Sequence, residues 1–203
     1  MTLAQAQTST EFWFAPPYIT AGDTGNPPTN YQEPLLLRIT SSDLASTITI
    51  TMPALGATAF GGAGSIVVNI PANTQQTVDL SAYKNDLFTA PWDTILNTGL
   101  KISATEEITV YYEVNSSRNP DIFALKGQNA LGTQFYTPFN NSFGNGSKDD
   151  PPYTAFDIVA TEDNTTVWIY PRVALEGGHP PLQAYSIVLD EGQTLSLIHI
   201  SDG

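Results

Sequence analysis

An internal repeat constrains the fold of this chain more than any other feature of its sequence. Four groups of segments recur in the same order at nearly constant spacing, and the offset is about 119 to 120 residues for the match that begins at residue 37. The matched segments are 10–13 with 133–136, 37–43 with 157–163, 47–53 with 166–171, and 66–70 followed by 76–80 with 185–189 followed by 193–195. Because a repeat of this length folds in the same way each time, we expect two similar units in succession.

Each copy has the pattern of β-strands. Residues 47–51 alternate Thr and Ile, and residues 108–114 place Ile, Val and Tyr at every second position, as in strands with one buried face. Turn-forming residues such as Asp163 and Asn164 separate these runs, and no stretch has helical periodicity long enough for a principal helix. We therefore expect an all-β fold of two successive antiparallel β-sandwich repeats: residues 10–115 as the first repeat, 116–132 as a linking segment and 133–203 as the second repeat.

The second repeat is expected to be incomplete. In the first repeat, strand patterns continue after residue 80 through residues 99–102 and 107–112, and the second has no room for their counterparts. A sandwich without its last strands leaves backbone donors and acceptors unpaired along an edge. Residues 133–203 expressed alone should therefore aggregate or be readily proteolysed, and a sharp cooperative melt would contradict this expectation.

Composition and charge exclude several classes of function. The formal net charge is −13 and only seven residues are Lys or Arg, scattered along the sequence, so we expect no nucleic-acid partner. No apolar run reaches the roughly 18 residues of a membrane-spanning helix, so we expect no membrane insertion. Cysteine is absent, which excludes disulfides and thiolate sites.

The two ends of the sequence carry separate signals. Residues 4–6 (Ala-Gln-Ala) have the form of a signal-peptidase site, which predicts a secreted protein whose leader is missing, although an ordinary terminus fits as well. Residues 195–200 resemble the translated end of a transposon-derived sequencing adapter, so residues 195–203 would be a non-native tail. The alternative is a genuine final strand in which Leu195, Leu197 and His199 alternate.

Residues able to support catalysis are few. His179 and His199 are the two histidines, no nucleophile elbow, Walker loop or zinc motif is present, and we predict no catalytic residue, no metal site and no cofactor. A glycosidase would need only two carboxylates, for which the candidates are Asp93, Glu106, Glu107, Asp149 and Asp150. A Ca²⁺ site using Asp149, Asp150 or Asp163 is chemically feasible, but their spacing does not specify one.

Aromatic residues give the better indication of a binding site. In the repeated strand, Val167 and Ile169 take the inward positions of Ile48 and Ile50, so Trp168 and Tyr170 share the outward face. These two rings are our predicted ligand-binding residues, and they could instead cover the junction between the repeats or contact a neighbouring domain. We expect the rings around Trp13 to fill the core and Trp92 to pack a loop against a sheet.

The sequence resembles the IgG Fc-binding protein N-terminal domain family. The segments that carry the resemblance are residues 10–17, 37–41, 121–125, 130–133, 160–167 and 192–194. Glu107 and Lys126 depart from the family pattern, which has Pro near both positions. In bacteria such domains typically belong to large secreted or cell-surface proteins, so the resemblance implies an extracellular binding or structural module, without establishing antibody binding.

These observations predict a non-enzymatic module of a bacterial cell-surface or adhesion protein. Its partners would be proteins or glycans at the cell surface, together with neighbouring domains of a longer chain. Two alternatives remain: an accessory carbohydrate-binding or carboxylate-dependent glycan-degrading module, which needs two acids converging in a cleft, and a purely architectural spacer, which needs no ligand.

Overall fold

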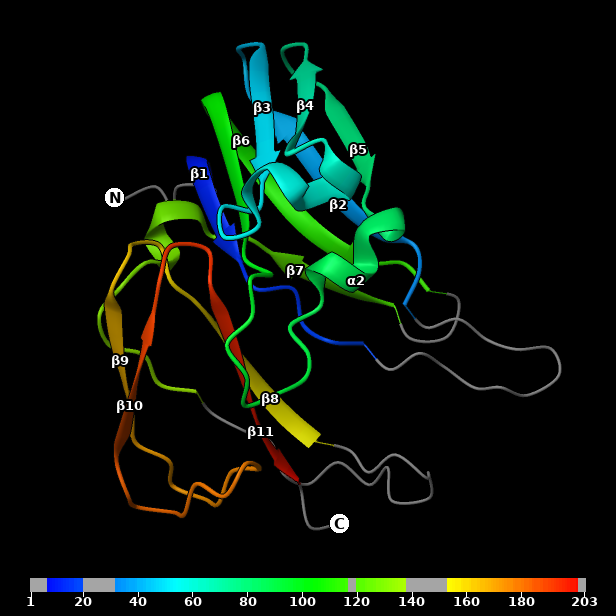
Figure 1. Cartoon of the computed structure of the whole chain (residues 1–203). Helices are drawn as coiled ribbons and strands as arrows, with labels where there is room; N and C mark the ends of the chain where they lie inside the picture. Colours follow the sequence, from blue (N-terminus) through cyan, green and yellow to red (C-terminus); the bar gives the residue numbers. More distant parts are fainter. Residues whose placement is uncertain (1–6, 20–31, 117–119, 138–152, 201–203) are drawn as a thin grey trace, which may run out of the picture.

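The computed structural model describes residues 7–19, 32–116, 120–137 and 153–200, and in these residues the fold is mostly β (Figure 1). A seven-stranded antiparallel sheet contains β1 (Ser9–Phe14), β2 (Leu35–Ser41), β3 (Ser46–Thr51), β4 (Ser65–Ile70), β5 (Gln75–Asp79), β6 (Leu100–Val114) and β7 (Asp121–Ala124). Two small sheets pair β8 (Tyr153–Val159) with β11 (Thr194–Ile200) and β9 (Thr165–Ile169) with β10 (Tyr185–Leu189).

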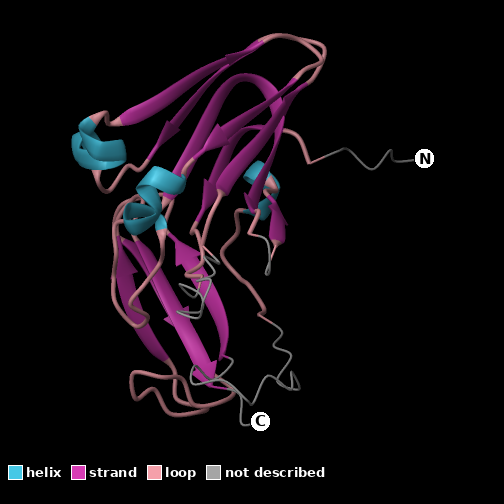
Figure 2. Ribbon diagram, turned by 90° about the vertical axis from the view of Figure 1, so that its right-hand side faces the viewer, coloured by secondary structure: helices cyan, strands magenta, loops and turns pink. Residues whose placement is uncertain are grey.

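The helices of the described residues are short and lie between strands (Figure 2). They are η1 (Gly56–Thr58), α1 (Ala59–Gly62), η2 (Ser81–Tyr83), α2 (Lys84–Leu87) and η3 (Gly127–Ala130). In this part of the chain no helix is long and apolar enough to cross a membrane. The expectation of a β-rich, antiparallel fold is therefore confirmed.

One long strand, β6, organises the large sheet. Its first residues lie between β1 and β3, with Ile102 opposite both Phe12 and Ile50. Its last residues lie between β2 and β7, with Tyr112 opposite both Leu37 and Phe123. Because a single strand belongs to both groups of neighbours, the sheet curves into a nearly closed, barrel-like structure.

The main hydrophobic core lies inside this curved sheet. Alternate residues of β2, β3 and β6 point inward and are fully buried, as the period-two pattern predicts: Leu37, Ile39, Ile48, Ile50, Ile102, Ile108 and Tyr112. Phe14, Tyr112 and Phe123 form an aromatic cluster with ring centroids 4.9 to 6.2 Å apart. The rings around Trp13 were expected to fill the core, and Phe12 does so, because it is fully buried. Trp13 itself is partly exposed, and the Lys101 ammonium lies over its ring, 4.7 Å from the ring centroid.

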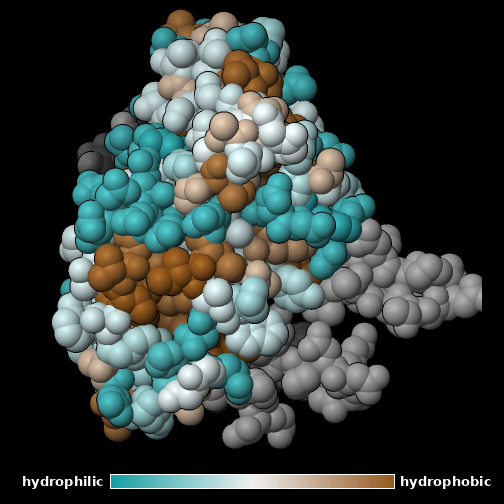
Figure 3. Space-filling model, viewed as in Figure 1, coloured by the Kyte–Doolittle hydropathy of each residue, from teal (hydrophilic) through white to brown (hydrophobic). Residues whose placement is uncertain are grey.

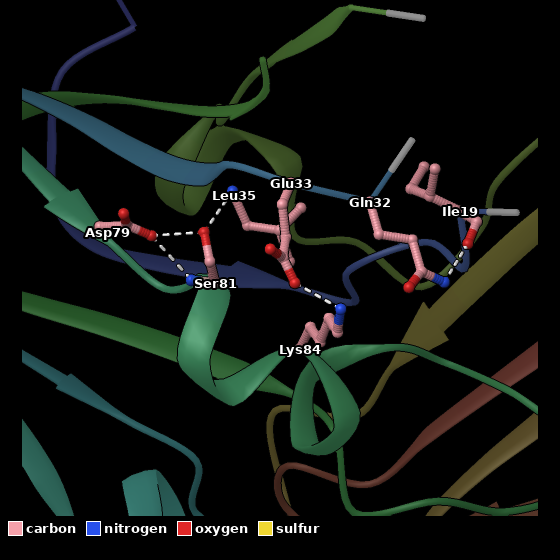
Figure 4. A network of polar contacts seen from close by, with 7 residues as sticks. All are labelled: Ile19, Gln32, Glu33, Leu35, Asp79, Ser81 and Lys84. Carbon is pink, nitrogen blue, oxygen red and sulfur yellow. Dashed lines mark hydrogen bonds and ion pairs between the residues drawn. The ribbon is translucent and has the colours of Figure 1, made fainter. Parts of the chain in front are cut away.

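Polar contacts fix the start of β2 against the end of β5 (Figure 4). The Ser81 hydroxyl accepts a hydrogen bond from the Leu35 backbone N–H at 3.0 Å and donates one to the Asp79 carboxylate at 2.5 Å. Lys84 forms an ion pair with Glu33 next to this contact. The segment predicted as a link contributes to the same sheet, because β7 pairs with β6 and Leu125 is buried in the main core.

We refer to residues 10–115 as the first repeat and to residues 133–203 as the second. The second has its own small core, between the β8–β11 and β9–β10 hairpins in the lower half of Figure 1. Its buried members are Ile169, Leu175, Leu195 and Leu197. Residues 194–200 thus form a strand with Leu195 and Leu197 facing a core, as the strand interpretation predicts.

The two repeats have the same strand register. With a constant offset of 119, every residue pair of β9–β10 is the counterpart of a pair in β3–β4: Val167 opposite Ile187 corresponds to Ile48 opposite Val68. With the same offset, every residue pair of β2–β5 corresponds to a residue pair of β8–β11. This register corrects one detail of the sequence alignment, because the counterpart of Gln76 is Leu195 rather than Gln193.

Backbone hydrogen bonds join the second repeat to the first along β11. Asp93 donates to the Ser196 carbonyl at 2.8 Å, Leu96 and Thr194 exchange two bonds at 2.8 and 2.9 Å, and Gly99 donates to Gly192 at 3.0 Å. Residues 93–99 therefore cover the edge of β11 that faces away from β8. The opposite edge of this two-stranded sheet, along β8, pairs with no strand in the described part of the chain.

Candidate binding surface

The outward face of the β9–β10 hairpin carries the predicted aromatic pair. Because Val167 and Ile169 point into the small core, the alternating strand turns Trp168 outward, and Tyr170 follows at the end of β9. The side chains of Trp168 and Tyr170 are 60% and 70% exposed. The exposed Val188 lies on the neighbouring strand, opposite Thr166.

The two rings do not cover the junction between the repeats. Rings that did so would be largely buried, whereas Trp168 and Tyr170 are among the most exposed large side chains of the described residues. That interpretation is therefore wrong, because residues 93–99 and β11 form the junction instead. The exposed pair remains available to a ligand or to a neighbouring domain.

The first repeat shows that strand pairing does not require aromatic residues at these positions. The counterparts of Trp168 and Tyr170 are Thr49 and Thr51, which occupy the same register on β3. An exposed aromatic residue in place of Thr adds apolar surface that this fold does not need. The pair is consequently a feature that distinguishes the second repeat from the first.

A second group of candidate residues, His179 and Asp93, meets at the junction. His179 Nε2 lies 2.9 Å from Asp93 Oδ1, and the His179 ring stacks on Tyr185 with centroids 3.9 Å apart. The Tyr185 hydroxyl is buried without a hydrogen-bond partner. Burial, and then the nearby Asp93 charge, raise the pKa of Tyr185 to about 12.

This His–Asp contact joins two loops. A Cβ atom at Gly177, where φ is +87°, would lie 2.0 Å from Asp93 Oδ2, so glycine allows the carboxylate to approach. No Ser or Thr hydroxyl of the described residues contacts the His179 ring, so the arrangement lacks the nucleophile of a hydrolase. Sequence reasoning named Asp93 and His179 separately, and nothing in their spacing indicated that they pair.

The candidate carboxylates do not converge. Asp93 pairs with His179, and Glu106 and Glu107 lie in the middle of β6, where Glu107 accepts a hydrogen bond from the Thr8 hydroxyl at 3.0 Å. Asp149 and Asp150 lie outside the described residues.

Asp163 belongs to a turn, where its carboxylate accepts a hydrogen bond from the Glu191 N–H at 3.0 Å. Among the described residues, no group of three or more His, Asp or Glu side chains could hold a metal ion.

The two best-formed depressions on the described surface are shallow, and neither contains the aromatic pair. One is lined by Ala45, Ser46, Thr47, Asn69, Ile70 and Pro71, and the other by Glu113, Pro120, Asp121 and Ile122. The candidate binding site is thus an open β-sheet face rather than a cleft.

Comparison with known proteins identifies the segment that carries this face. Residues 121–202 match the family model of the IgGFc binding protein. The predicted family resemblance is confirmed over this range, which runs from the first residue of β7 through β11 and includes Trp168 and Tyr170. The IgGFc-binding family is not catalytic. No curated protein and no solved structure matches the chain significantly.

Proposed function

We propose that this chain is a non-enzymatic binding module of a secreted or cell-surface protein, and that Trp168 and Tyr170 contact a protein or glycan partner. The observation that carries the proposal is the exposure of two neighbouring aromatic side chains on one strand face, inside a segment that matches a binding family. Aromatic side chains supply large contact areas with little loss of conformational entropy, and they stack on sugar rings and protein surfaces.

The absence of converging acids among the described residues favours binding over glycan hydrolysis. A glycosidase holds two carboxylates about 5 to 10 Å apart across a sugar. Asp93 is engaged with His179, and the acids of β6 and of the 163 turn lie on other elements. No specific observation supports the enzymatic alternative, and the spacer alternative predicts no ligand for the aromatic face.

The proposed architecture is two successive β-sandwich repeats. Its support is the shared register of β2–β5 with β8–β11 and of β3–β4 with β9–β10. An extracellular location with further domains alongside is proposed from the family resemblance.

Replacing both rings with the residues of the first repeat tests the function. The Trp168→Thr/Tyr170→Thr variant should bind a hit from a glycan and immunoglobulin array at least about tenfold more weakly, as is usual for an aromatic contact at the centre of an interface. Its melting temperature should change little, because Thr occupies the same register in β3. Tyr111→Thr, which removes an exposed ring from β6, is the matched control and should bind normally.

Unchanged affinity together with a lower melting temperature would contradict the proposal. That result would assign the two rings to packing. No binding by the unmodified chain to any array member would favour the spacer alternative.

A further inference from the structure

The two sides of the β9–β10 hairpin differ in chemistry. Its inward side chains pack on the small core, and Figure 3 shows a contiguous hydrophobic area on the half of the molecule that contains β8–β11. Its outward side, which we call the aromatic face, carries the exposed side chains of Thr166, Trp168, Tyr170, Ser186 and Val188. None of these side chains is charged, so ionic attraction to a ligand has to come from the residues around the face.

The first repeat shows that the strands of a repeat do not cover this face. In β3 and β4, the counterparts of β9 and β10, the outward side chains of Thr47, Val67 and Asn69 are exposed. They are exposed although β3 pairs with β6 as well as with β4. Strand pairing of the kind that the first repeat shows therefore leaves the aromatic face open to a separate partner.

The surroundings of the aromatic face are negatively charged. Residues 153–200 contain six Asp or Glu residues and one Lys or Arg, which is Arg172. Three of the acids are exposed where β9 begins and β10 ends, and we call them the acidic turn: Glu162, Asp163 and Asp190. Because the whole chain also has a formal net charge of −13, it repels an anionic ligand and attracts a cationic one.

Backbone hydrogen bonds hold two carboxylates of the acidic turn in place. The Asp163 carboxylate accepts the N–H of Glu191, and the Asp190 carboxylate accepts the N–H of Asn164, both at 3.0 Å. Each carboxylate uses its Oδ1 atom in these bonds, so Oδ2 can accept a hydrogen bond from a ligand. The acidic turn thus presents fixed negative charge beside the aromatic face.

The first repeat already combines an outward Trp ring with a cation and carboxylates. The Lys101 ammonium lies 4.7 Å from the centroid of the Trp13 ring. The same ammonium lies 3.6 Å from Glu11 Oε2 and 3.3 Å from Glu191 Oε1. Among the described residues, no ammonium or guanidinium lies over the exposed ring of Trp168. Trp168 therefore offers to a ligand the ring face that Lys101 covers in Trp13.

We propose that the aromatic face binds a basic segment of a partner protein in an extended conformation. Its Lys or Arg side chains lie over Trp168 and Tyr170, and a further one pairs with the acidic turn. Strand residues rise about 3.3 Å each, so these two rings are roughly 7 Å apart along β9 and match alternate residues of an extended peptide. The inference rests on the proposed function and names the chemistry of its partner. A neutral glycan would use the rings but not the acids, so charge favours the basic polypeptide.

Two labelled peptides test the proposal on the intact chain. They are (Lys-Ser)4, the Lys peptide, and (Gln-Ser)4, the Gln peptide, and binding is measured by fluorescence anisotropy at low ionic strength. The Lys peptide should bind at least about tenfold more tightly than the Gln peptide, because ion pairing and cation–π attraction both need the charge. Its affinity should fall as salt is added.

Variants of the rings separate cation–π attraction from apolar burial. Trp168→Leu keeps an apolar side chain without the aromatic ring, and it should weaken binding of the Lys peptide about two- to fivefold. Trp168→Thr/Tyr170→Thr removes both rings and should weaken it about five- to thirtyfold. The control Tyr111→Thr should bind the Lys peptide normally.

A variant of the acidic turn separates a local site from attraction to the net charge. Glu162→Gln should weaken binding of the Lys peptide by up to about fivefold. The matched control is Asp43→Asn, because Asp43 is the counterpart of Glu162 in the first repeat and is also exposed. Asp43→Asn should leave the affinity unchanged, and equal effects of the two variants would contradict the proposal.

Three further results would overturn the proposal. The first is no binding of the Lys peptide at millimolar concentration, and the second is binding that the double Thr variant retains. The third is a glycan from the array that needs both rings and binds independently of salt, which would overturn this inference and keep the proposed function. Binding of neither peptide and of no array member would overturn both.

Discussion

At the residue scale, Gly99 marks a close approach of the two repeats. A Cβ atom at Gly99 would lie 2.5 Å from the Gly192 carbonyl oxygen and 2.9 Å from Val159 Cγ2. Neither atom belongs to a flexible end that can move away, because Gly192 O accepts the Gly99 N–H and Val159 lies in β8.

Gly99→Ala should therefore lower the free energy of unfolding by about 1 to 3 kcal/mol, the usual cost of overpacking. Urea denaturation measures this loss. Gly132→Ala is the matched control, since its Cβ would meet only the Phe135 ring at 3.4 Å. Equal stability of the two variants would show that the repeats do not meet at Gly99.

Asp157 should make stability depend on pH. Burial raises its pKa from the ordinary 3.8 to about 6, so folding favours the protonated form. Its stabilising contribution is complete below about pH 4 and is lost as pH rises to about 6, a loss of about 3 kcal/mol. The stability of Asp157→Asn relative to the unmodified chain should rise by about that amount over this range.

The matched control for this titration is Glu162→Gln, on an exposed turn. It removes one carboxylate from outside the β8–β11 sheet, so a pH dependence that both variants share does not come from Asp157. A constant stability difference between Asp157→Asn and the unmodified chain over this range would mean that the Asp157 carboxyl is solvated in the folded chain.

At the scale of elements, a buried chain of hydroxyl groups joins β11 to the first repeat. Thr98 Oγ1 lies 2.6 Å from Thr194 Oγ1 and 3.2 Å from Thr89 Oγ1, and Thr89 donates to the Pro16 carbonyl at 2.9 Å. A buried hydroxyl that loses its partner costs more than the hydrogen bond itself contributes.

Thr98→Val should consequently cost about 1 to 3 kcal/mol of stability, because it leaves Thr194 and Thr89 without this partner. The double variant Thr98→Val/Thr194→Val should cost less than the sum of the two single variants, as measured by urea denaturation. Thr166→Val, on the exposed face of β9, is the control and should change stability little. Strict additivity would contradict the shared hydrogen-bond chain.

Periodicity and repetition predict where the strands of this fold lie better than they predict which strands pair. The alternation of residues 47–51 and the repeat itself indicate strands and their inward faces, and Asn164, with φ of +56°, forms the predicted turn. The pattern of β6 cannot reveal that its two halves have different neighbours, because alternation specifies faces and not partners. The pairing of Asp93 with His179 likewise depends on loops brought together only by folding.

For the candidate site, the sequence likewise predicts the direction of the side chains but not their surroundings. Period two places Trp168 and Tyr170 outward, and the structure gives their exposure. Whether an outward side chain is covered depends on how residues 93–99 dock on β11, which local sequence does not encode. The alignment of Gln76 with Gln193 was wrong because it matched two identical side chains. The strand register, which sequence identity does not reveal, pairs Gln76 with Leu195 as its counterpart.

At the scale of the whole molecule, the described residues form one curved sheet around β6 and two small sheets with the strand register of β2–β5 and β3–β4. Residues 93–99 of the first repeat cover one edge of β11, which supports the expectation that residues 133–203 alone would not melt cooperatively.

Residue-resolved amide hydrogen exchange of the intact chain tests this account most directly. Because Ala160 donates to Gln193 on the β11 side, the alternate residues Asp157 and Val159 direct their N–H groups to the edge of β8 that faces away from β11. Their counterparts Arg38 and Thr40 face β6. The account predicts slow exchange at Arg38 and Thr40 and exchange near the unprotected rate at Asp157 and Val159; equal protection at all four amides would contradict it.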